Sequence, residues 1–305
     1  MKIINNKTGD RMKSYDVLCF GACVIDQREN TETCTLGGDA ANQSLIIKRL
    51  GLQPVLCAAM GQDKAGKTIR DILQLHNIST DFLIDNPSWT TTHSLIHLDH
   101  RKERSFTVTG GAHRLLDKTH FPFQLIPTCR AVSLGSMFTL HLLEEDGLLE
   151  IFQMAKAHQC ITFSDTSTDR YHKGLNKVKE FLPYIDYFMP SYDEAAALTG
   201  KTNPDEIANV LFAHGANTVI IKLGSDGAAL YRKDRKIHID AYPARVIDTT
   251  GAGDHFCGSF IASILSGLSE DKALHNACWL GARATESYGT NDTDFQTLPY
   301  PIDKK

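Results

Sequence analysis

Short apolar runs alternate along the chain with segments whose apolar residues recur at helical spacing. The run 16–25 is nearly continuous, as expected of a strand buried on both faces, and 54–60 reads as the next strand. Further strands are expected near 130–134, 160–164, 185–189 and 217–223, with helices near 141–157, 171–181, 191–199 and 204–214. This alternation predicts an α/β fold with a doubly wound, mostly parallel sheet flanked by helices.

Residues 90–111 break the alternation. Polar and apolar residues alternate there on both sides of a charged turn, which predicts a β-hairpin. The threonine-rich stretch 27–36 is expected to supply another strand, so that a small β-sheet lid covers a crevice and excludes water. We expect one domain over 15–294, between a polar tail at 1–14 and a C-terminal tail at 295–305.

A glycine-rich turn opens a helix in the last third of the chain. Gly251, Ala252 and Gly253 stand where the loop becomes the helix, so unpaired backbone N–H groups can point at an anion. Asp254 follows in the first turn of that helix. An anion cradle with an adjacent carboxylate suits phosphoryl transfer, in which the carboxylate accepts a proton from the incoming hydroxyl. The alternative is that Asp254 only complements the helix dipole.

A second constellation lies near the amino terminus. Asp26 is expected at the carboxyl end of the first strand, where open α/β sheets bind ligands. Gly38 lets a ligand approach the backbone closely at the start of a helix. Asp39 and Asn42 are one turn apart on that helix. Together these groups can hold vicinal hydroxyls. Asp26 could equally be a solvated loop acid, and Asp39 a helix N-cap.

Two further motifs each allow two interpretations. The octet from Gly61 to Thr68 matches the P-loop pattern, with Lys67 at the phosphate-binding position and Asp165 as a loose candidate for the magnesium aspartate. The octet also reads as a tight turn with a solvated lysine. Glu194 follows Ser191 by three residues, so it either holds a metal-bound water or completes a capping box.

Composition narrows the partners. The 305 residues carry a formal net charge of −4, which leaves no electrostatic footprint for nucleic acid or an anionic membrane. No run approaches the length of a membrane span, and the first residues do not resemble a signal sequence. Eight cysteines without a C-x-x-C pair indicate buried reduced thiols in a cytoplasmic protein. We therefore expect a small-molecule partner.

Two motifs together resemble the PfkB carbohydrate kinases, the ribokinase-like family. One runs from Gly37 to Ser44 and continues to Gly51 and Gly61, and the other is Asp248-Thr-Thr-Gly-Ala-Gly-Asp254. The likeness covers nearly the whole chain and implies ATP-dependent phosphorylation of a sugar-like hydroxyl. It implies Asp254 as the base and Gly251, Ala252 and Gly253 as the anion hole. It also implies that the octet at Gly61 is a turn that does not bind nucleotide.

The same resemblance implies the ligands of the site. Substrate contacts are expected from Asp26, Gly38, Asp39 and Asn42, and nucleotide contacts from Ser191, Lys222, Gly224 and Gly227. Glu194 is expected to hold Mg²⁺ through water. A potassium ion is expected beside Asp248, Thr250, Ala284, Gly289 and Thr293. Association into a homodimer through the lid is a further expectation.

Several residues depart from the family pattern. Ser191 replaces the usual asparagine, His255 follows the catalytic aspartate where a small residue is common, and His113 replaces the asparagine after the flap. Asp39 stands where ribokinases usually have lysine, which favours a neutral polyol over an anionic sugar phosphate. The alternatives are a nucleoside kinase of the same fold, with Phe106, Met137 and Phe138 as the apolar slot, and a non-catalytic sugar-sensing protein.

Overall fold

The computed structural model describes residues 13–29, 31, 34–98, 104–287 and 297–302. Its centre is a nine-stranded sheet in the order β13-β12-β11-β10-β9-β8-β1-β4-β5. The strands from β5 to β11 are parallel to their neighbours, and β12 and β13 add an antiparallel edge. The strand bounds are β1 (Tyr15–Phe20), β4 (Pro54–Gly61), β5 (Leu83–Asn86), β8 (Cys129–Met137), β9 (Ile161–Thr166), β10 (Tyr187–Phe188), β11 (Val219–Lys222), β12 (Ala228–Arg232) and β13 (Arg235–Ile239).

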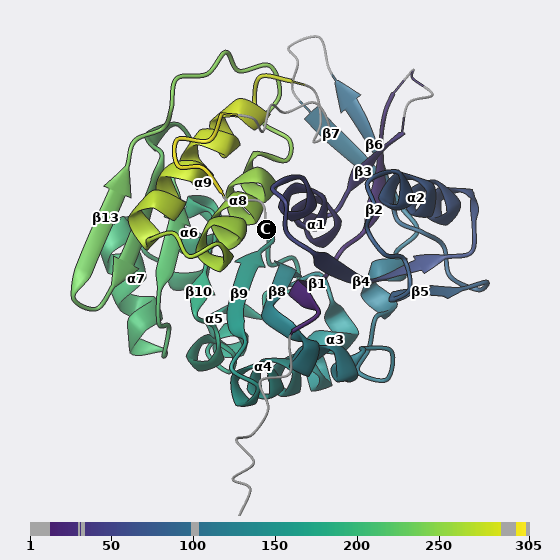
Figure 1. Ribbon diagram of the computed structural model, residues 1–305, viewed down its shortest axis with the longest axis horizontal. Coiled ribbons are helices and arrows are strands. Elements are labelled where there is room, and N and C mark those ends of the chain that lie inside the picture. The colour runs from purple at the N-terminus through teal and green to yellow at the C-terminus, as the bar shows by residue number, and fades with distance from the viewer. Residues whose placement is uncertain (1–12, 30, 32–33, 99–103, 288–296, 303–305) are drawn as a thin grey trace, which may run out of the picture.

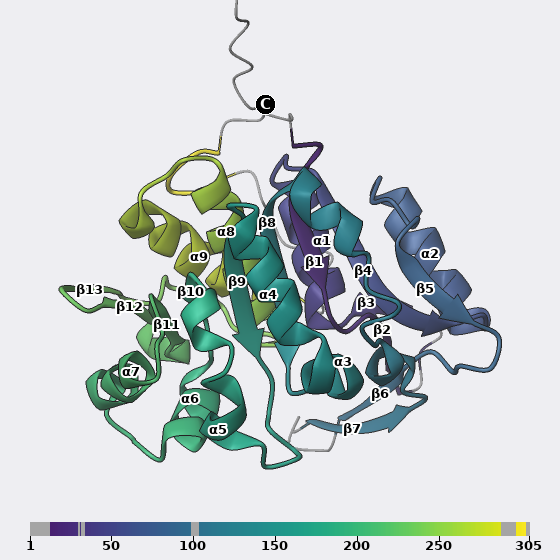
Figure 2. The same ribbon diagram turned by 90° about the horizontal axis from the view of Figure 1, so that it is seen from below.

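Helices cover both faces of this sheet (Figures 1 and 2). One face carries α1 (Asp39–Arg49), α2 (Lys64–Leu75), α8 (Ala252–Leu265) and α9 (Glu270–Ala284). The other carries α3 (His141–Asp146), α4 (Leu148–Ala157), α5 (Gly174–Val178), α6 (Tyr192–Thr199) and α7 (Pro204–Ala213). Successive residues of β1 alternate between the two cores: Val17 and Cys19 join the first, Leu18 and Phe20 the second. The predicted doubly wound α/β fold is therefore confirmed.

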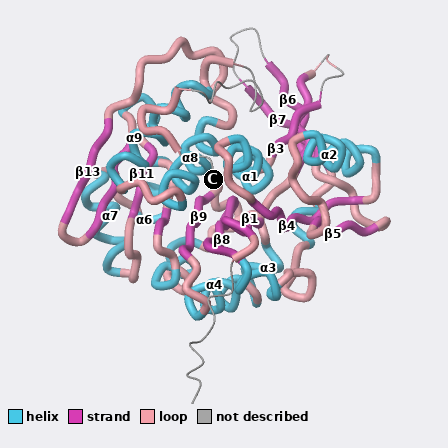
Figure 3. The backbone as a smooth tube through the Cα atoms, viewed as in Figure 1, coloured by secondary structure: helices cyan, strands magenta, loops and turns pink. Residues whose placement is uncertain are grey.

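A second, four-stranded sheet stands beside the first in the order β3-β2-β6-β7 (Figure 3). Its strands are β2 (Val24–Arg28), β3 (Cys34–Gly37), β6 (His93–Leu98) and β7 (Arg104–Thr109). The hairpin expected within 90–111 is β6–β7, which pairs antiparallel. The central pair β2–β6 is parallel, so the lid is a mixed sheet rather than a simple antiparallel flap.

Several predicted boundaries were wrong, mostly because the chain turns at residues with positive φ. The apolar run 16–25 is two strands, because Gly21 (φ 148) ends β1 and the chain then enters β2 of the lid. The helix expected at 171–181 shortens to α5, since His172 (φ 53) and Gly174 (φ 62) interrupt it. The helix expected at 141–157 divides at Gly147 into α3 and α4. The strand β5 was not predicted.

The P-loop-like octet forms a closed turn at the base of the lid. Asp63 caps α2 by accepting the Gly66 N–H at 2.8 Å, and it also accepts the Thr91 N–H at 2.8 Å where the chain enters the lid. A Cβ on Gly66 would lie 2.1 Å from the Gly61 carbonyl oxygen, so the turn is closed on itself, and its Gly66 N–H is already bonded to Asp63. The Lys67 side chain is 78% exposed and pairs with Asp71. The arrangement agrees with the tight-turn interpretation.

Two other expectations concern the chain as a whole. No disulfide joins the eight cysteines, all of which lie in the described part, and seven of them are buried. Within the described ranges, none of the helices has the length and apolarity needed to cross a bilayer.

Candidate active site

The amino-terminal end of α8 is open and rich in backbone donors. Gly251 is the N-cap of α8 and adopts the left-handed conformation (φ 76). It has no side chain that could accept a hydrogen bond from the first N–H groups of the helix. The first N–H groups of a helix have no intrahelical acceptors, so this end can receive an anion. Asp254 lies in the same first turn and is only 9% exposed. The structure thus places the predicted anion hole and the predicted base side by side.

A hydrogen bond joins this end of α8 to the start of α1. Asn42 Nδ2 donates to Asp254 Oδ2 at 2.7 Å, across 212 residues of sequence. The helices approach closely there, because a Cβ on Gly258 would lie 2.8 Å from Ile46 Cγ2. Burial raises the pKa of Asp254 well above its ordinary value, the negative charge of Asp39 adds to this, and the Asn42 hydrogen bond acts in the opposite direction. A carboxyl with a raised pKa is suited to accept a proton near neutral pH.

The glycine pair brings the lid against α1. Gly38 (φ 87) is the N-cap of α1, and a Cβ there would lie 2.5 Å from the Ala22 carbonyl oxygen. A Cβ on Gly37 would lie 2.2 Å from Asp26 Oδ2, so the Asp26 carboxylate rests on this glycine. Asp39 is the first residue of α1 and Gly38 is the N-cap, so the alternative interpretation of Asp39 as the N-cap was wrong. The expectation that Asp26 ends a central strand was also wrong, since it lies on lid strand β2.

The Asp26 carboxyl is largely removed from water. Burial raises its pKa to about 6, and a hydrogen bond with Ser94 on the neighbouring strand β6 partly offsets the effect. Asp26, Asp39 and Asp254 therefore bring three carboxyl groups to the α1 side of the site, as the sequence predicted for Asp26 and Asp39 together.

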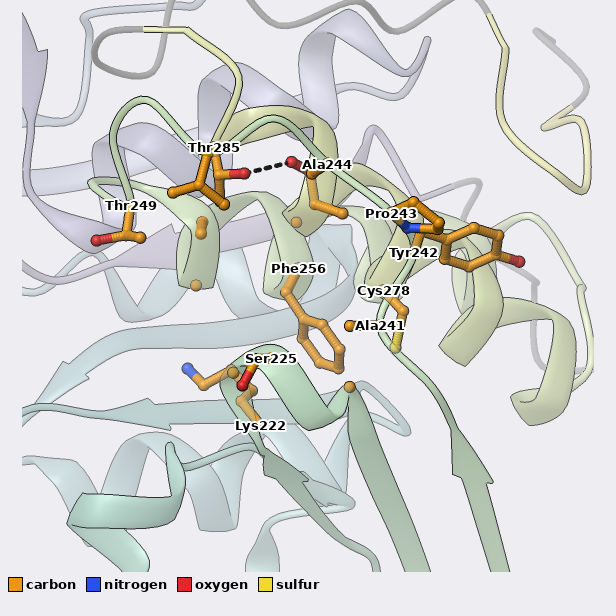
Figure 4. A pocket seen from close by; sticks show the side chains of 17 residues that line it. Lys222, Ser225, Ala241, Tyr242, Pro243, Ala244, Thr249, Phe256, Cys278 and Thr285 are labelled. Atoms are coloured by element: carbon orange, nitrogen blue, oxygen red, sulfur yellow. Dashed lines mark hydrogen bonds between the residues drawn. The ribbon is translucent and has the colours of Figure 1, made fainter.

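A cavity of about 540 Å³ lies on the other side of the α8 end (Figure 4). Its lining is mostly apolar, with Phe256 reaching into the middle and Tyr242 at one end. Three of the predicted nucleotide contacts line it, namely Lys222, Gly224 and Gly227, together with Gly253 of the anion hole. Ser191 does not line it. Sequence reasoning missed most of the remaining wall, because 241–246 has no periodicity and 278–285 reads as an ordinary core helix. The lining residues from these two segments are Ala241, Tyr242, Pro243, Ala244, Val246, Cys278, Gly281, Ala282 and Thr285.

Lys222 brings a positive charge to the floor of this cavity. Its Nζ would lie 3.6 Å from a Cβ on Gly253, beside the anion hole. Both oxygens of the buried Asp165 carboxylate accept hydrogen bonds from Nζ at 2.7 Å. Burial alone would lower the pKa of Lys222, but the Asp165 charge raises it above the usual value, so the side chain is a cation at neutral pH. The Cys257 thiol also donates to Asp165 Oδ2 at 3.3 Å.

Comparison with known proteins identifies the family to which this chain belongs. Residues 14–297 match the pfkB family carbohydrate kinases. The chain belongs to that family. It is 23% identical over 288 residues to an ATP-dependent 6-phosphofructokinase of Thermoanaerobacterium thermosaccharolyticum, covering 86% of this chain and 85% of the relative. It is 27% identical over 292 residues to an aminoimidazole riboside kinase of Salmonella typhimurium, covering 91% and 89%.

The fold likeness agrees with the family. A ribokinase of Arabidopsis thaliana, solved in complex with ribose and ATP, superposes with a TM-score of 0.77 at 21% identity, covering 90% of this chain and 94% of that one. The protein is therefore a carbohydrate kinase, a phosphotransferase with an alcohol group as acceptor.

The pfkB kinase forms the capping box expected as one interpretation of Glu194. The Ser191 N–H donates to Glu194 Oε2 at 2.9 Å, and the Ser191 hydroxyl accepts the Glu194 N–H at 3.4 Å. Thr166 also donates to Glu194 Oε2 at 2.7 Å. Glu194 is close enough to Asp165 to raise the pKa of that carboxyl further, after the larger effect of burial. Glu194 therefore completes the capping box and also lies beside Asp165, the partner of Lys222 at the floor of the cavity.

Asp248 holds the turn that precedes the anion hole. Its Oδ1 accepts the Thr250 N–H at 2.7 Å, and the N–H groups of Ile247 and Asp248 donate to the Thr285 carbonyl just after Ala284. Asp248 therefore caps its own turn, and the contacts with Thr285 bring Asp248 and Thr250 close to Ala284. Gly289 and Thr293 lie outside the described residues.

Both histidine departures have structural partners in the kinase. His255 is fully buried and its Nδ1 lies 2.8 Å from the Gly251 carbonyl oxygen, so it braces the anion-hole turn. His113 Nδ1 lies 2.6 Å from Thr92 Oγ1, between the two connections to the lid. Burial lowers the pKa of each to about 4, which keeps both rings neutral at physiological pH.

The buried charge of Asp26 generates a stability prediction. The folded state raises its pKa from 3.8 to about 6, so the folded protein binds this proton more tightly than the unfolded chain. The ionised carboxylate therefore costs stability that is fully felt above pH 6 and disappears below about pH 4. We predict that Asp26→Asn stabilises the ligand-free protein by roughly 1–3 kcal/mol at pH 7.5, and less as the pH falls. Thermal unfolding across this pH range measures the effect.

The exposed Asp234→Asn is the matched control and should leave the unfolding temperature unchanged. A lower unfolding temperature for Asp26→Asn at pH 7.5 would show that the carboxylate is stabilised by its surroundings instead.

Proposed function

We propose that this kinase transfers the γ-phosphoryl group of ATP to a hydroxyl of a neutral monosaccharide or sugar-like polyol. The observation that carries the proposal is the hydrogen bond between Asn42 and Asp254. This bond joins Asp254, the proposed base at the start of α8, to Asn42 on α1, next to the carboxyl-rich side of the site and beside the cavity. A hydroxyl bound on one side would face a phosphoryl group bound on the other.

Each group then has a role in the reaction. Asp254 accepts the proton of the attacking hydroxyl while Asn42 fixes the orientation of its carboxylate. The amides of Gly251, Ala252 and Gly253 donate to the oxygens of the transferring group as charge develops there. Lys222, held by Asp165, supplies a fixed positive charge beside Gly253. Donors and charges that are fixed before the reaction act most strongly where water is excluded.

The cavity suits the nucleotide. Its volume of about 540 Å³ and its apolar wall fit an aromatic base, and its inner end opens on Lys222 and Gly253, where phosphates would lie. Mg²⁺ usually binds through one or two carboxylates plus substrate phosphates, and Glu194 is the carboxylate that could hold it through water, whereas Asp165 is already paired with Lys222. The bound ion would neutralise charge on the ATP phosphates.

A neutral acceptor follows from the charges around Asp254. Asp39 is near enough to raise the pKa of Asp254, and the Asp26 carboxylate on lid strand β2 lies against Gly37, just before α1. A phosphorylated sugar would bring a further negative charge among them, at a cost that grows as water is excluded. The same carboxylates and the Asn42 amide can accept from and donate to sugar hydroxyls.

The alternatives are less well supported by this site. Met137 and Phe138 are two residues of the apolar slot proposed for a nucleoside base. They are 1% and 5% exposed and belong to the core on the sheet face that carries α3 to α7. The idea of a non-catalytic sugar sensor rested on Ser191 and His255, yet Ser191 completes a capping box and His255 braces Gly251. Association through the lid remains a prediction; Val108 on β7 is 46% exposed there.

A screen of ATP consumption tests the proposal. Pentoses, hexoses, sugar acids, nucleosides and, because one relative is a 6-phosphofructokinase, sugar phosphates are compared as acceptors. We expect a neutral sugar or polyol to give the highest kcat/KM. Asp254→Asn should lower kcat by roughly 10²-fold or more because the base is lost, whereas Lys67→Ala on exposed α2 should stay within about threefold. Strong preference for a phosphorylated sugar, or turnover retained by Asp254→Asn, would contradict the proposal.

We also propose a monovalent cation beside Asp248. A hard cation needs several oxygen ligands, and the Asp248 carboxylate with nearby carbonyls can provide part of such a set. The ion would order the turn before Gly251 and so favour phosphoryl transfer. We expect kcat/KM for the best acceptor to be at least about threefold higher in potassium than in tetramethylammonium at equal ionic strength, which corresponds to at least about 0.6 kcal/mol. Equal rates would mean that Asp248 is only a turn cap.

A further inference from the structure

An ion pair crosses from the lid to the turn before the anion hole. Arg28 ends lid strand β2, and its guanidinium nitrogen lies 3.8 Å from Asp248 Oδ2. The Asp248 side chain is 8% exposed and that of Arg28 is 34% exposed, so the contact is shielded on the Asp248 side. The two residues are 220 positions apart in sequence, and they connect two parts of the site that bind different ligands in the proposed reaction.

The Asp248 end of this contact controls backbone geometry. Its other carboxylate oxygen accepts the Thr250 N–H at 2.7 Å, and Gly251 follows immediately in the left-handed conformation that opens α8. A shift of Asp248 would therefore be passed through one hydrogen bond to the amides that receive the phosphoryl group. Displacements of about 1 Å at such donors can cost on the order of 10²-fold in rate.

The Arg28 end of the contact is linked to the proposed acceptor site through strand β2. Asp26 and Arg28 are two residues apart on β2, so they project from the same face of the strand. β2 is also held on both sides, by β3 and by β6, and therefore moves as part of the lid sheet. If acceptor binding at Asp26 changes the position of β2, the Arg28 side chain moves with the strand.

Charge gives the contact a second effect. Asp248 is a buried carboxylate three residues before Gly251, where ATP phosphates are proposed to bind. Uncompensated, it would repel those phosphates. The Arg28 guanidinium lowers that repulsion, in addition to the proposed monovalent cation, while the lid holds the guanidinium near Asp248.

We propose that Arg28 is a positioning residue for phosphoryl transfer, which couples the lid to the anion hole through Asp248. The inference rests on the proposed kinase function and names a residue that the PfkB resemblance did not supply. It predicts that loss of the Arg28 charge loosens the turn 248–251 and slows the chemical step.

Hydrogen exchange of the ligand-free protein tests the structural half of the proposal without any turnover. Arg28→Gln should speed amide exchange at Thr250 and the neighbouring residues of the turn at least threefold relative to the wild type. Gln27→Ala is the matched control, because Gln27 projects from the opposite face of β2 and its amide donates to the Thr31 carbonyl within the lid. Its exchange in 248–251 should equal that of the wild type. Unchanged exchange in Arg28→Gln would overturn the proposal.

Kinetics test the functional half. Arg28→Gln should lower kcat about tenfold with little change in KM for the acceptor, and Arg28→Lys, which retains a charge, should recover part of the loss. In a double-mutant cycle, Arg28→Gln should have less than a twofold effect once Asp248 is Asn. Independent, multiplicative effects of the two substitutions would overturn the coupling. A wild type without activity on any acceptor would count against the proposed function, while the exchange experiment would still decide the role of Arg28.

Discussion

The site depends on one hydrogen bond between helices that are distant in sequence. Asn42 on α1 and Asp254 on α8 meet at 2.7 Å where the two helices begin, and both helices pack on the same face of the central sheet. The close approach needs a glycine at 258 and a left-handed turn at Gly251. Once these conditions are met, the fold fixes the proposed base Asp254, the proposed anion hole at Gly251–Gly253 and the nearby carboxyl group of Asp39 relative to one another.

Buried charge is the cost of this arrangement, and the structure offsets it unequally. Asp165 is satisfied by Lys222 and Cys257, so that part of the site is a compensated ion pair. Asp26 and Asp254 have raised pKa values because burial outweighs their hydrogen bonds. Carboxyl groups held in this way are poised to accept hydrogen bonds or a proton from a ligand, which is consistent with function maintained at the expense of stability.

Much of the fold and part of the site could be predicted from the sequence. Buried parallel strands leave long apolar runs, and the two glycine motifs sit at helix starts, so the architecture and the residues Asn42, Gly251 and Asp254 were recognisable. Pairing across the lid was not, because the run 16–25 is apolar throughout and Gly21 divides it only through its φ of 148. From the sequence, Asp165 was only a loose candidate for the magnesium aspartate of a P-loop protein. Its partner Lys222 is 57 residues away, so only the folded sheet shows that the two form a pair. Segment 241–246 gave no periodic signal at all.

The pH dependence of kcat tests the central claim most directly. Because the Asn42 hydrogen bond lowers the pKa of Asp254 against the larger effect of burial, its removal should raise that pKa further. We predict that kcat falls on the acid side with an apparent pKa above the ordinary range of an aspartate, and that Asn42→Ala moves this limb to higher pH. The profile of Lys67→Ala should superimpose on that of the wild type. An acid limb that stays in place or moves to lower pH in Asn42→Ala would contradict the account.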